Sequence, residues 1–222
     1  ISWTEIKYQR IGEQPWSVEA FIWSQFSDND SYQTLEQIAN IFVGTSTNAD
    51  DVFILEDKTV NDSTISAYSP QEGKYIEIEA EICIPFLRGR EIARYREAND
   101  SVVVIFPYER GSKPLDLLSS EELSFRYPKA WAYLNRHKNK LQARENGRWK
   151  GKDDWYCHAY PRNHDQITNL KLLSPDICNS GQWMMDVAGK YHCLNTVYGV
   201  SEVETDHSLK FLLSVLNSKS FE

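Results

Sequence analysis

Apolar and polar positions recur along the chain with two different periods, which predicts a mixed α and β domain. Tyr75-Ile-Glu-Ile-Glu79 alternates at every second residue, as a half-buried strand does. Residues 102–106 form an unbroken β-branched and aromatic run, which predicts a central strand. Residues 128–141 repeat apolar residues at helical spacing after Pro128, which suits the first turn of a helix. We therefore expect an α+β fold without internal repeats.

Weaker patterns predict the remaining elements. Residues 44–51 predict a polar loop, residues 70–74 a turn, and residues 85–95 a turn that leads into a short helix. Further helices are predicted at residues 31–41, 115–123 and 208–216, and further strands at residues 41–44, 52–55, 64–68, 170–173, 183–186 and 197–203. The last helix is amphipathic, and we expect more helical protein to follow it in a longer parent chain.

The composition is that of a folded globular protein, with 41% apolar and 13% aromatic residues among 222. Seven tryptophans and twelve tyrosines exceed what such a core needs, so some rings should lie at interfaces. No apolar run approaches the roughly 18 residues of a membrane span. The first ten residues lack the features of a signal peptide, and the chain does not begin with methionine. We therefore expect a cytoplasmic fragment of a larger protein.

Charge is distributed unevenly along the chain. The formal net charge is -8 at pH 7, which is unfavourable for binding phosphates. Residues 126–152, the basic window, nevertheless hold nine basic residues and one acid, Glu145, for a charge of +8. The rest of the chain holds 15 basic and 31 acidic residues, for a charge of -16. This asymmetry predicts a nucleic-acid-facing side on an acidic body, although a solvated helix and loop would have the same composition.

Motifs for enzymatic chemistry are missing from the sequence. An adenine-specific DNA methyltransferase needs a polar residue, Pro-Pro and an aromatic residue in succession to hold a flipped adenine, and the chain has no Pro-Pro. A glycine-rich nucleotide loop is also missing, and the histidines and the widely separated cysteines show no metal-ligand spacing. Pro175-Asp176 is similar to the start of a nuclease metal site, but Asp186 and Lys190 have the wrong spacing. We expect no catalytic centre and no metal site in this chain.

An ordered series of short motifs resembles a known family. The series is Phe86-Leu-Arg-Gly-Arg-Glu-Ile-Ala-Arg-Tyr95, Val102-Val-Val-Ile-Phe-Pro-Tyr108, Tyr127-Pro-Lys-Ala-Trp-Ala-Tyr-Leu134, Lys138-Asn-Lys-Leu-Gln-Ala-Arg144, Trp155-Tyr-Cys-His-Ala-Tyr-Pro-Arg162, Leu170-Lys-Leu-Leu-Ser-Pro175 and Leu212-Leu-Ser-Val-Leu-Asn-Ser218. In this order the motifs are similar to those of the TaqI-like C-terminal specificity domains of adenine-specific DNA methyltransferases and type II restriction–modification enzymes. Thr45-Ser-Thr-Asn48 departs from the pattern, because the family often has a glycine in that loop.

The resemblance implies a target-recognition domain with a curved, mostly antiparallel sheet flanked by helices. Such a domain would hold double-stranded DNA against an N-terminal methyltransferase domain of the same parent chain. That missing domain would bind S-adenosylmethionine and flip the adenine, whereas this chain would select the sequence without a cofactor. We expect one domain in a prokaryotic parent, with an approach segment (residues 1–30), a recognition core (residues 31–207) and the start of a C-terminal helical part (residues 208–222).

Candidate DNA contacts come from the basic window, the Leu-Arg-Gly-Arg motif, the polar loop and Arg162. They are Thr45, Thr47, Asn48, Arg88, Arg90, Arg136, Lys138, Lys140, Arg144, Arg148, Lys150 and Arg162. Contacts to phosphates would fix the register of the duplex, and contacts to base edges would select the sequence. Structural roles are the alternative: Arg88 could pair with an acid such as Glu81, and the threonines could only close a hairpin. Trp155 and Tyr156 are expected in the core.

Two other functions stay open at this stage. Specificity subunits of multi-subunit restriction systems contain similar domains, but such subunits usually carry two of them, separated by long helices. A protein-interaction module that never touches DNA would account for the acidic body.

Overall fold

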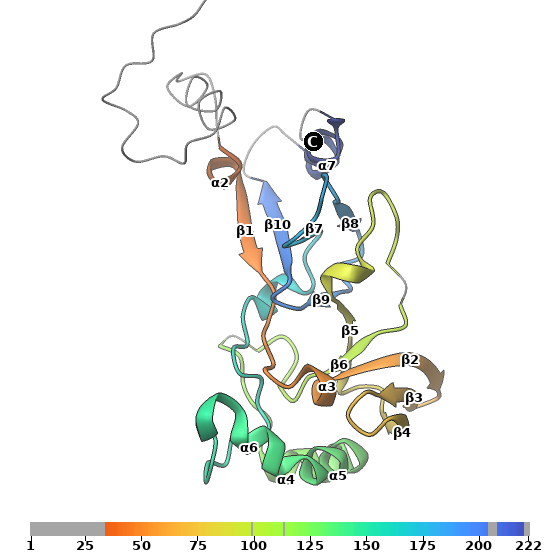
Figure 1. The fold of residues 1–222 in the computed structure, drawn as a ribbon, viewed down its shortest axis with the longest axis vertical. Coiled ribbons are helices and arrows are strands. Elements are labelled where there is room, and N and C mark those ends of the chain that lie inside the picture. Colours follow the sequence, from red (N-terminus) through yellow and green to blue (C-terminus); the bar gives the residue numbers. More distant parts are fainter. Residues whose placement is uncertain (1–33, 99, 113, 204–207, 220–222) are drawn as a thin grey trace, which may run out of the picture. The chain divides into compact units, whose positions relative to one another are not determined.

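The computed structural model describes residues 34–98, 100–112, 114–203 and 208–219. The chain divides into two compact units, residues 1–38 and residues 39–222. Within the described residues, the first unit contains helix α2 (Leu35–Ile38). The second unit contains two β-sheets, three consecutive helices and a C-terminal helix among its described residues (Figure 1).

The four-stranded sheet is antiparallel throughout, in the order β1-β10-β7-β8. Its strands are β1 (Ala39–Val43), β7 (Lys171–Pro175), β8 (Met184–Asp186) and β10 (Val197–Val203). The helix predicted at residues 31–41 is wrong for residues 39–41, and residues 31–33 lie outside the described residues. The cause is long-range: the main chain of β1 pairs with β10, and Gly199 leaves room for the ring of Phe42 across that pair.

The six-stranded sheet has the order β4-β3-β2-β6-β5-β9 and is antiparallel except where β5 pairs with β9. Its strands are β2 (Ile54–Asn61), β3 (Thr64–Ser69), β4 (Lys74–Glu79), β5 (Cys83–Leu87), β6 (Val103–Ile105) and β9 (His192–Cys193). β6 lies inside the sheet with all its residues buried, which confirms the predicted central strand. The register of β2 shifts between Glu56 and Thr59, around Asp57 with a φ of 49°, and such a bulge bends a strand.

Three consecutive helices pack beside the six-stranded sheet (Figure 1). They are α4 (Ser120–Arg126), α5 (Pro128–Arg136) and α6 (Lys138–Gly147). α4 begins later than the pattern at residues 115–123 predicts, because Ser119 and Glu122 form a capping box around its first turn. The helix predicted at residues 128–141 is interrupted at His137, where φ is -103° and ψ is 9°.

Four further helical elements lie elsewhere in the second unit. They are α3 (Asp50–Phe53), the 3-10 turns η2 (Gly89–Glu91) and η3 (His164–Gln166), and α7 (Leu209–Leu216). Residues 52–53 therefore end a helix instead of starting a strand, and residues 85–87 belong to β5 rather than to a turn. α7 confirms the predicted C-terminal helix, and Ser208 caps it by accepting a hydrogen bond from the main-chain N–H of Phe211 at 3.2 Å.

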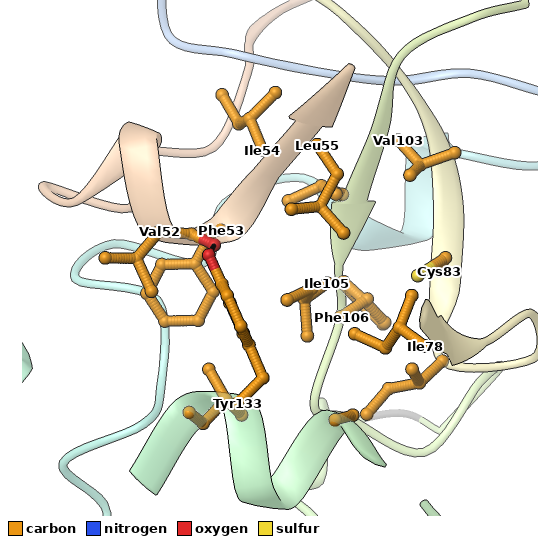
Figure 2. Close-up of a cluster of buried hydrophobic side chains, with 14 of the residues drawn as sticks. Val52, Phe53, Ile54, Leu55, Ile78, Cys83, Val103, Ile105, Phe106 and Tyr133 are labelled. Carbon is orange, nitrogen blue, oxygen red and sulfur yellow. Dashed lines mark hydrogen bonds between the residues drawn. The ribbon is translucent and has the colours of Figure 1, made fainter. Parts of the chain in front are cut away.

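The larger hydrophobic core lies between the six-stranded sheet and helices α4–α6. Figure 2 shows Tyr133 reaching from α5 toward Val52 and Phe53. Its hydroxyl donates to the Val52 carbonyl at 3.0 Å and lies 2.8 Å from Ser69 Oγ, so the buried oxygen is fully satisfied. A smaller core lies between the four-stranded sheet and the segment around η2; it consists of Phe42, Leu87, Ile92, Leu173, Met184, Tyr191, Cys193 and Val197.

Other sequence predictions concern burial and cysteine chemistry. Trp155 and Tyr156 are both buried in the larger core, as expected. All four cysteines are free thiols: Cys83 and Cys193 are buried, Cys157 is partly buried and Cys178 is exposed. None of the helices formed by the described residues has the length and apolar character needed to cross a membrane.

Candidate nucleic-acid interface

The polar loop at residues 45–48 is mostly buried. The side chains of Thr45 and Thr47 have no exposed surface: Thr45 Oγ1 donates to the Tyr160 carbonyl at 3.0 Å, and Thr47 Oγ1 donates to Asp50. These two predicted DNA contacts therefore hold the loop together and offer no side-chain atoms to a duplex in this conformation. Asn48 is different, because it is exposed and adopts left-handed backbone with a φ of 52°.

A second loop breaks the helical path inside the last turn of α6, beginning at Arg144, where φ is -53° and ψ is 146°. Glu145 and Asn146 have φ values of 47° and 59°, and Gly147 follows with 85°. Left-handed backbone at a non-glycine residue other than asparagine or aspartate is uncommon and costs free energy, so Glu145 is held there by its contacts. The chain turns at Asn146 and Gly147, and Arg148 follows with half of its side chain exposed.

A third segment, Tyr160 to Arg162, lies against the first. The main chains of Ser46 and Tyr160 form an isolated antiparallel bridge, with N–H to carbonyl distances of 3.1 and 2.9 Å. This bridge joins segments that lie far apart in the sequence. It brings Tyr160, which is 37% exposed, beside Arg148 and the loop at residues 145–148.

The three segments together form what we name the loop cluster: Asn48, Glu145, Arg148, Tyr160 and Arg162. The guanidinium of Arg148 lies 5.8 Å from the centre of the Tyr160 ring, and that of Arg162 lies 5.2 Å from it. Asn48 Nδ2 donates to Glu145 Oε1 at 2.7 Å, and Arg148 Nη1 donates to Glu145 Oε2 at 3.0 Å. Hydrogen bonds from Tyr160 and then from Arg148 lower the pKa of Glu145, and the same hydrogen bond to Glu145 raises the pKa of Tyr160.

The loop cluster combines groups that nucleic-acid binding requires. Two arginines can contact phosphate oxygens, the amide of Asn48 can donate and accept hydrogen bonds, and Tyr160 offers an exposed ring. Glu145 occupies the donors of Asn48 and Arg148 in the way that a bound anion would. Sequence reasoning missed Glu145 and Tyr160, although Glu145 is the single acid of the basic window.

In the helical half of the basic window, residues 126–140, most of the basic side chains pair with carboxylates of the strands and loops beside them. Ion pairs join the helical half to the rest of the unit: Arg126 with Glu109 at 2.7 Å and Glu81 at 3.8 Å, Lys129 with Glu77, Arg136 with Glu72 at 2.9 Å, and Lys140 with Asp51. Lys138 is exposed and lies over the Trp155 ring at 5.2 Å. The predicted contacts Arg136 and Lys140 are thus engaged within the protein, whereas Lys150 is exposed beyond the turn.

Arg144 is buried, with 6% of its surface exposed, although the sequence places it among the candidate phosphate contacts. Its guanidinium faces the interior and donates to backbone carbonyls. In this conformation it cannot reach a phosphate.

The Leu-Arg-Gly-Arg motif forms a separate charged group between the end of β5 and η2. Arg88 pairs with Glu56 and with Glu91, whose Oε1 lies 2.6 Å from Arg88 Nη2, so the structural alternative of pairing with an acid is present, with these two acids in place of Glu81. Burial lowers the pKa of Arg88, but the hydrogen bonds to these acids outweigh it and the net shift is upward. Arg90 is two-thirds exposed and pairs with the same acids at 2.9 and 3.0 Å. Both predicted contacts therefore already have carboxylate partners.

Groups that could suggest catalysis have structural partners. Asp186, part of the discarded nuclease pattern, accepts a hydrogen bond from the buried Lys171 at 2.7 Å. Burial lowers the pKa of His158 to about 4 and that of His192 to about 3, which keeps both rings neutral at pH 7. Among the described residues, no group of three or more histidine, cysteine, aspartate or glutamate side chains is placed to hold a metal ion.

The second unit is thus an α+β domain whose loops gather cationic, aromatic and amide groups on one exposed cluster. No protein-family model matches the chain. The chain is similar to the Type II methyltransferase M.BanIII of Aneurinibacillus aneurinilyticus, with 26% identity over 219 residues. The aligned region covers 93% of this chain and 34% of that protein. The chain is therefore related to a type II methyltransferase and spans about a third of its length.

Proposed function

We propose that this chain is a TaqI-like target-recognition domain, which selects the DNA sequence for an adenine-specific, S-adenosylmethionine-dependent DNA methyltransferase or a fused restriction–modification enzyme. The observation that carries the proposal is the match of nearly the whole chain to only 34% of a type II methyltransferase. The sequence has no Pro-Pro, so the motif that would hold a flipped adenine belongs to another part of the parent.

The loop cluster supplies the contacts in this proposal. Arg148 and Arg162 would bind phosphate oxygens and set the register of the duplex. Asn48 could donate and accept at once, as asparagine does toward adenine in the major groove. Glu145 would release these groups as the phosphate oxygens replace its carboxylate, or would itself accept a hydrogen bond from a cytosine amine.

A binding titration tests the proposal. Fluorescence anisotropy of a labelled duplex of mixed sequence, measured between 50 and 200 mM salt, should show affinity that falls steeply with salt, because phosphate contacts release counterions. Arg148→Ala should weaken binding and flatten the salt dependence by roughly one unit of log–log slope. Arg136→Ala is the matched control, because Arg136 lies in the helical half and is paired with Glu72. Salt-insensitive or undetectable binding by the unmodified chain would contradict the proposal.

A further inference from the structure

Arg144 joins three segments of the chain through backbone hydrogen bonds. Nε donates to the Leu141 carbonyl at 2.9 Å, and Nη1 donates to the Thr47 carbonyl at 2.6 Å. Nη2 donates to the carbonyls of Trp155 and Cys157 at 2.8 and 2.9 Å. Four of the five N–H groups of one guanidinium therefore hold the end of α6, the loop at residues 45–48 and the segment at residues 155–157 in one arrangement.

Aromatic rings surround the same guanidinium. The ring centre of Trp149 lies 4.4 Å from Arg144 Cζ, and that of Phe53 lies 5.6 Å away. Burial lowers the pKa of Arg144, and among the described residues no ion pair joins it to a carboxylate. Its charge is balanced by carbonyl dipoles and ring faces, so it binds the backbone of the loops rather than an opposite charge.

Each segment that Arg144 holds carries part of the loop cluster. Asn48 follows directly on the Thr47 carbonyl, and Glu145 follows directly on Arg144. Tyr160 lies three residues beyond the Cys157 carbonyl. A planar, fixed set of donors sets the distances between these segments, which the single ammonium of lysine would not do.

We infer that Arg144 is the positioning residue of the recognition site: it fixes the relative placement of Asn48, the Glu145–Arg148 turn and Tyr160, and thereby sets which base sequence the cluster prefers. This inference rests on the proposed function. It differs from a role in overall stability, because a loss of stability lowers the folded fraction and weakens binding to every sequence equally.

The test compares Arg144→Lys with Arg136→Lys in the full chain. The probe is a pool of random-sequence duplexes, sequenced before and after selection. We expect Arg144→Lys to reduce the enrichment of the preferred sequences over the pool average about tenfold, the size of one lost base discrimination, while the salt dependence of binding is kept. Arg136→Lys should leave the enrichment unchanged. Equal enrichment by the unmodified chain and Arg144→Lys would overturn the inference and leave the proposed function standing. An unmodified chain that enriches nothing would overturn both.

Hydrogen exchange of the free chain gives a readout without DNA. Arg144→Lys should speed exchange in peptides that cover residues 45–48, 145–150 and 157–162 and leave the hairpin at residues 64–79 unchanged. If Arg144→Lys does not fold, Trp149→Phe keeps the four hydrogen bonds and reduces the stacking surface, and the same three segments should exchange faster. Exchange that is unchanged in these segments, or that rises uniformly across the chain, would overturn the inference.

Discussion

The basic window contains two regions that are both basic in sequence. They differ in how many of their basic side chains remain available to a ligand. In the helical half, residues 126–140, most cations pair with carboxylates that come from other parts of the unit. In the loop half, residues 144–152, Arg148 pairs with its neighbour Glu145 and with no other acid of the described residues, and Lys150 and Lys152 are exposed. A phosphate approaching the helical half would meet a carboxylate beside most cations, whereas one approaching the loop half would meet exposed cations, a tyrosine and a single carboxylate, Glu145. Charge counted along a sequence therefore does not locate a binding surface until the pairs are known.

The ion pairs of the helical half do not make it especially stable. Exposed pairs contribute about 0–1 kcal/mol each, because water screens them and long side chains lose freedom. Their main effect is to cancel the field of the basic residues at the surface. The two halves thus differ in how much unpaired charge they offer to a ligand, and four measurements test this difference.

The largest expected effect comes from removing two arginines of the loop cluster, compared with removing two arginines of the helical half. Arg148→Ala with Arg162→Ala should weaken binding to a mixed-sequence duplex about 100-fold at 100 mM salt and lower the log–log salt slope by nearly two. Arg126→Ala with Arg136→Ala removes the same number of charges from the helical half and should change affinity less than about threefold. Anisotropy titrations of both double variants measure this. Equal losses would show that the two halves do not differ as binding surfaces.

Acid should loosen the segment at residues 155–162, which Arg144 joins to the loop half, before the helical half. The ring of His158 is buried against Phe53, Phe106 and Tyr108, and burial lowers its pKa to about 4. An unfolded histidine binds its proton near pH 6.5, so between these values the unfolded chain holds more protons and stability falls as pH falls. The loss from His158 reaches up to about 3 kcal/mol at pH 4, and His192 acts in the same direction.

The helical half should lose stability only at a lower pH. Burial raises the pKa of Glu72, but hydrogen bonds from Arg136, Lys74 and His137 outweigh it, and the net shift is downward from 4.5. Its stabilising contribution is present above pH 4.5 and is lost only below that value. Hydrogen exchange at pH 7, 5.5 and 4.5 should show residues 155–162 opening first, and His158→Gln should reduce this pH dependence. Stability that stays constant from pH 6.5 to 5 would sink the prediction.

A helix cap from the neighbouring strand should stabilise the helical half without affecting the affinity for DNA. Glu79 on β4 accepts hydrogen bonds from the main-chain N–H groups of Lys129 and Ala130 at 2.8 and 3.0 Å, in the first turn of α5. Glu79→Ala should lower the free energy of unfolding by about 1–2 kcal/mol, as loss of an N-cap does. Urea unfolding measures this, with the exposed Glu81→Ala as control. A change in DNA affinity beyond twofold would contradict the separation of the halves.

Removing the carboxylate of the loop cluster should give a small gain in affinity for DNA. Glu145→Gln removes the negative charge of the loop cluster and frees Arg148, so affinity for a mixed-sequence duplex should rise about fivefold, mainly through faster association. Glu77→Gln removes an equivalent carboxylate from the helical half, where it pairs with Lys129, and should have a smaller effect. Stopped-flow association rates distinguish the two. A loss of affinity in Glu145→Gln would instead assign Glu145 a direct contact with the nucleic acid.

Local patterns were sufficient for the elements that their own residues stabilise. β10 has the predicted bounds, the strands at residues 64–68 and 75–79 are present, and α7 begins at its capping serine. The failures lie where distant partners decide. Residues 39–41 are extended because β10 pairs with them. Residues 52–53 belong to the short helix α3, which directly precedes β2.

The sequence by itself determined the α+β class, the main repeating elements, the absence of a Pro-Pro motif and the residue types from which a binding site could be built. Only the tertiary structure decided which of these groups are exposed. Asn48 meets Glu145, and Arg144 meets Thr47, across 97 residues in each case. Hydrogen bonds and ion pairs act over a few ångströms between groups that folding brings together, so a pattern along the chain specifies a charge but not its partner.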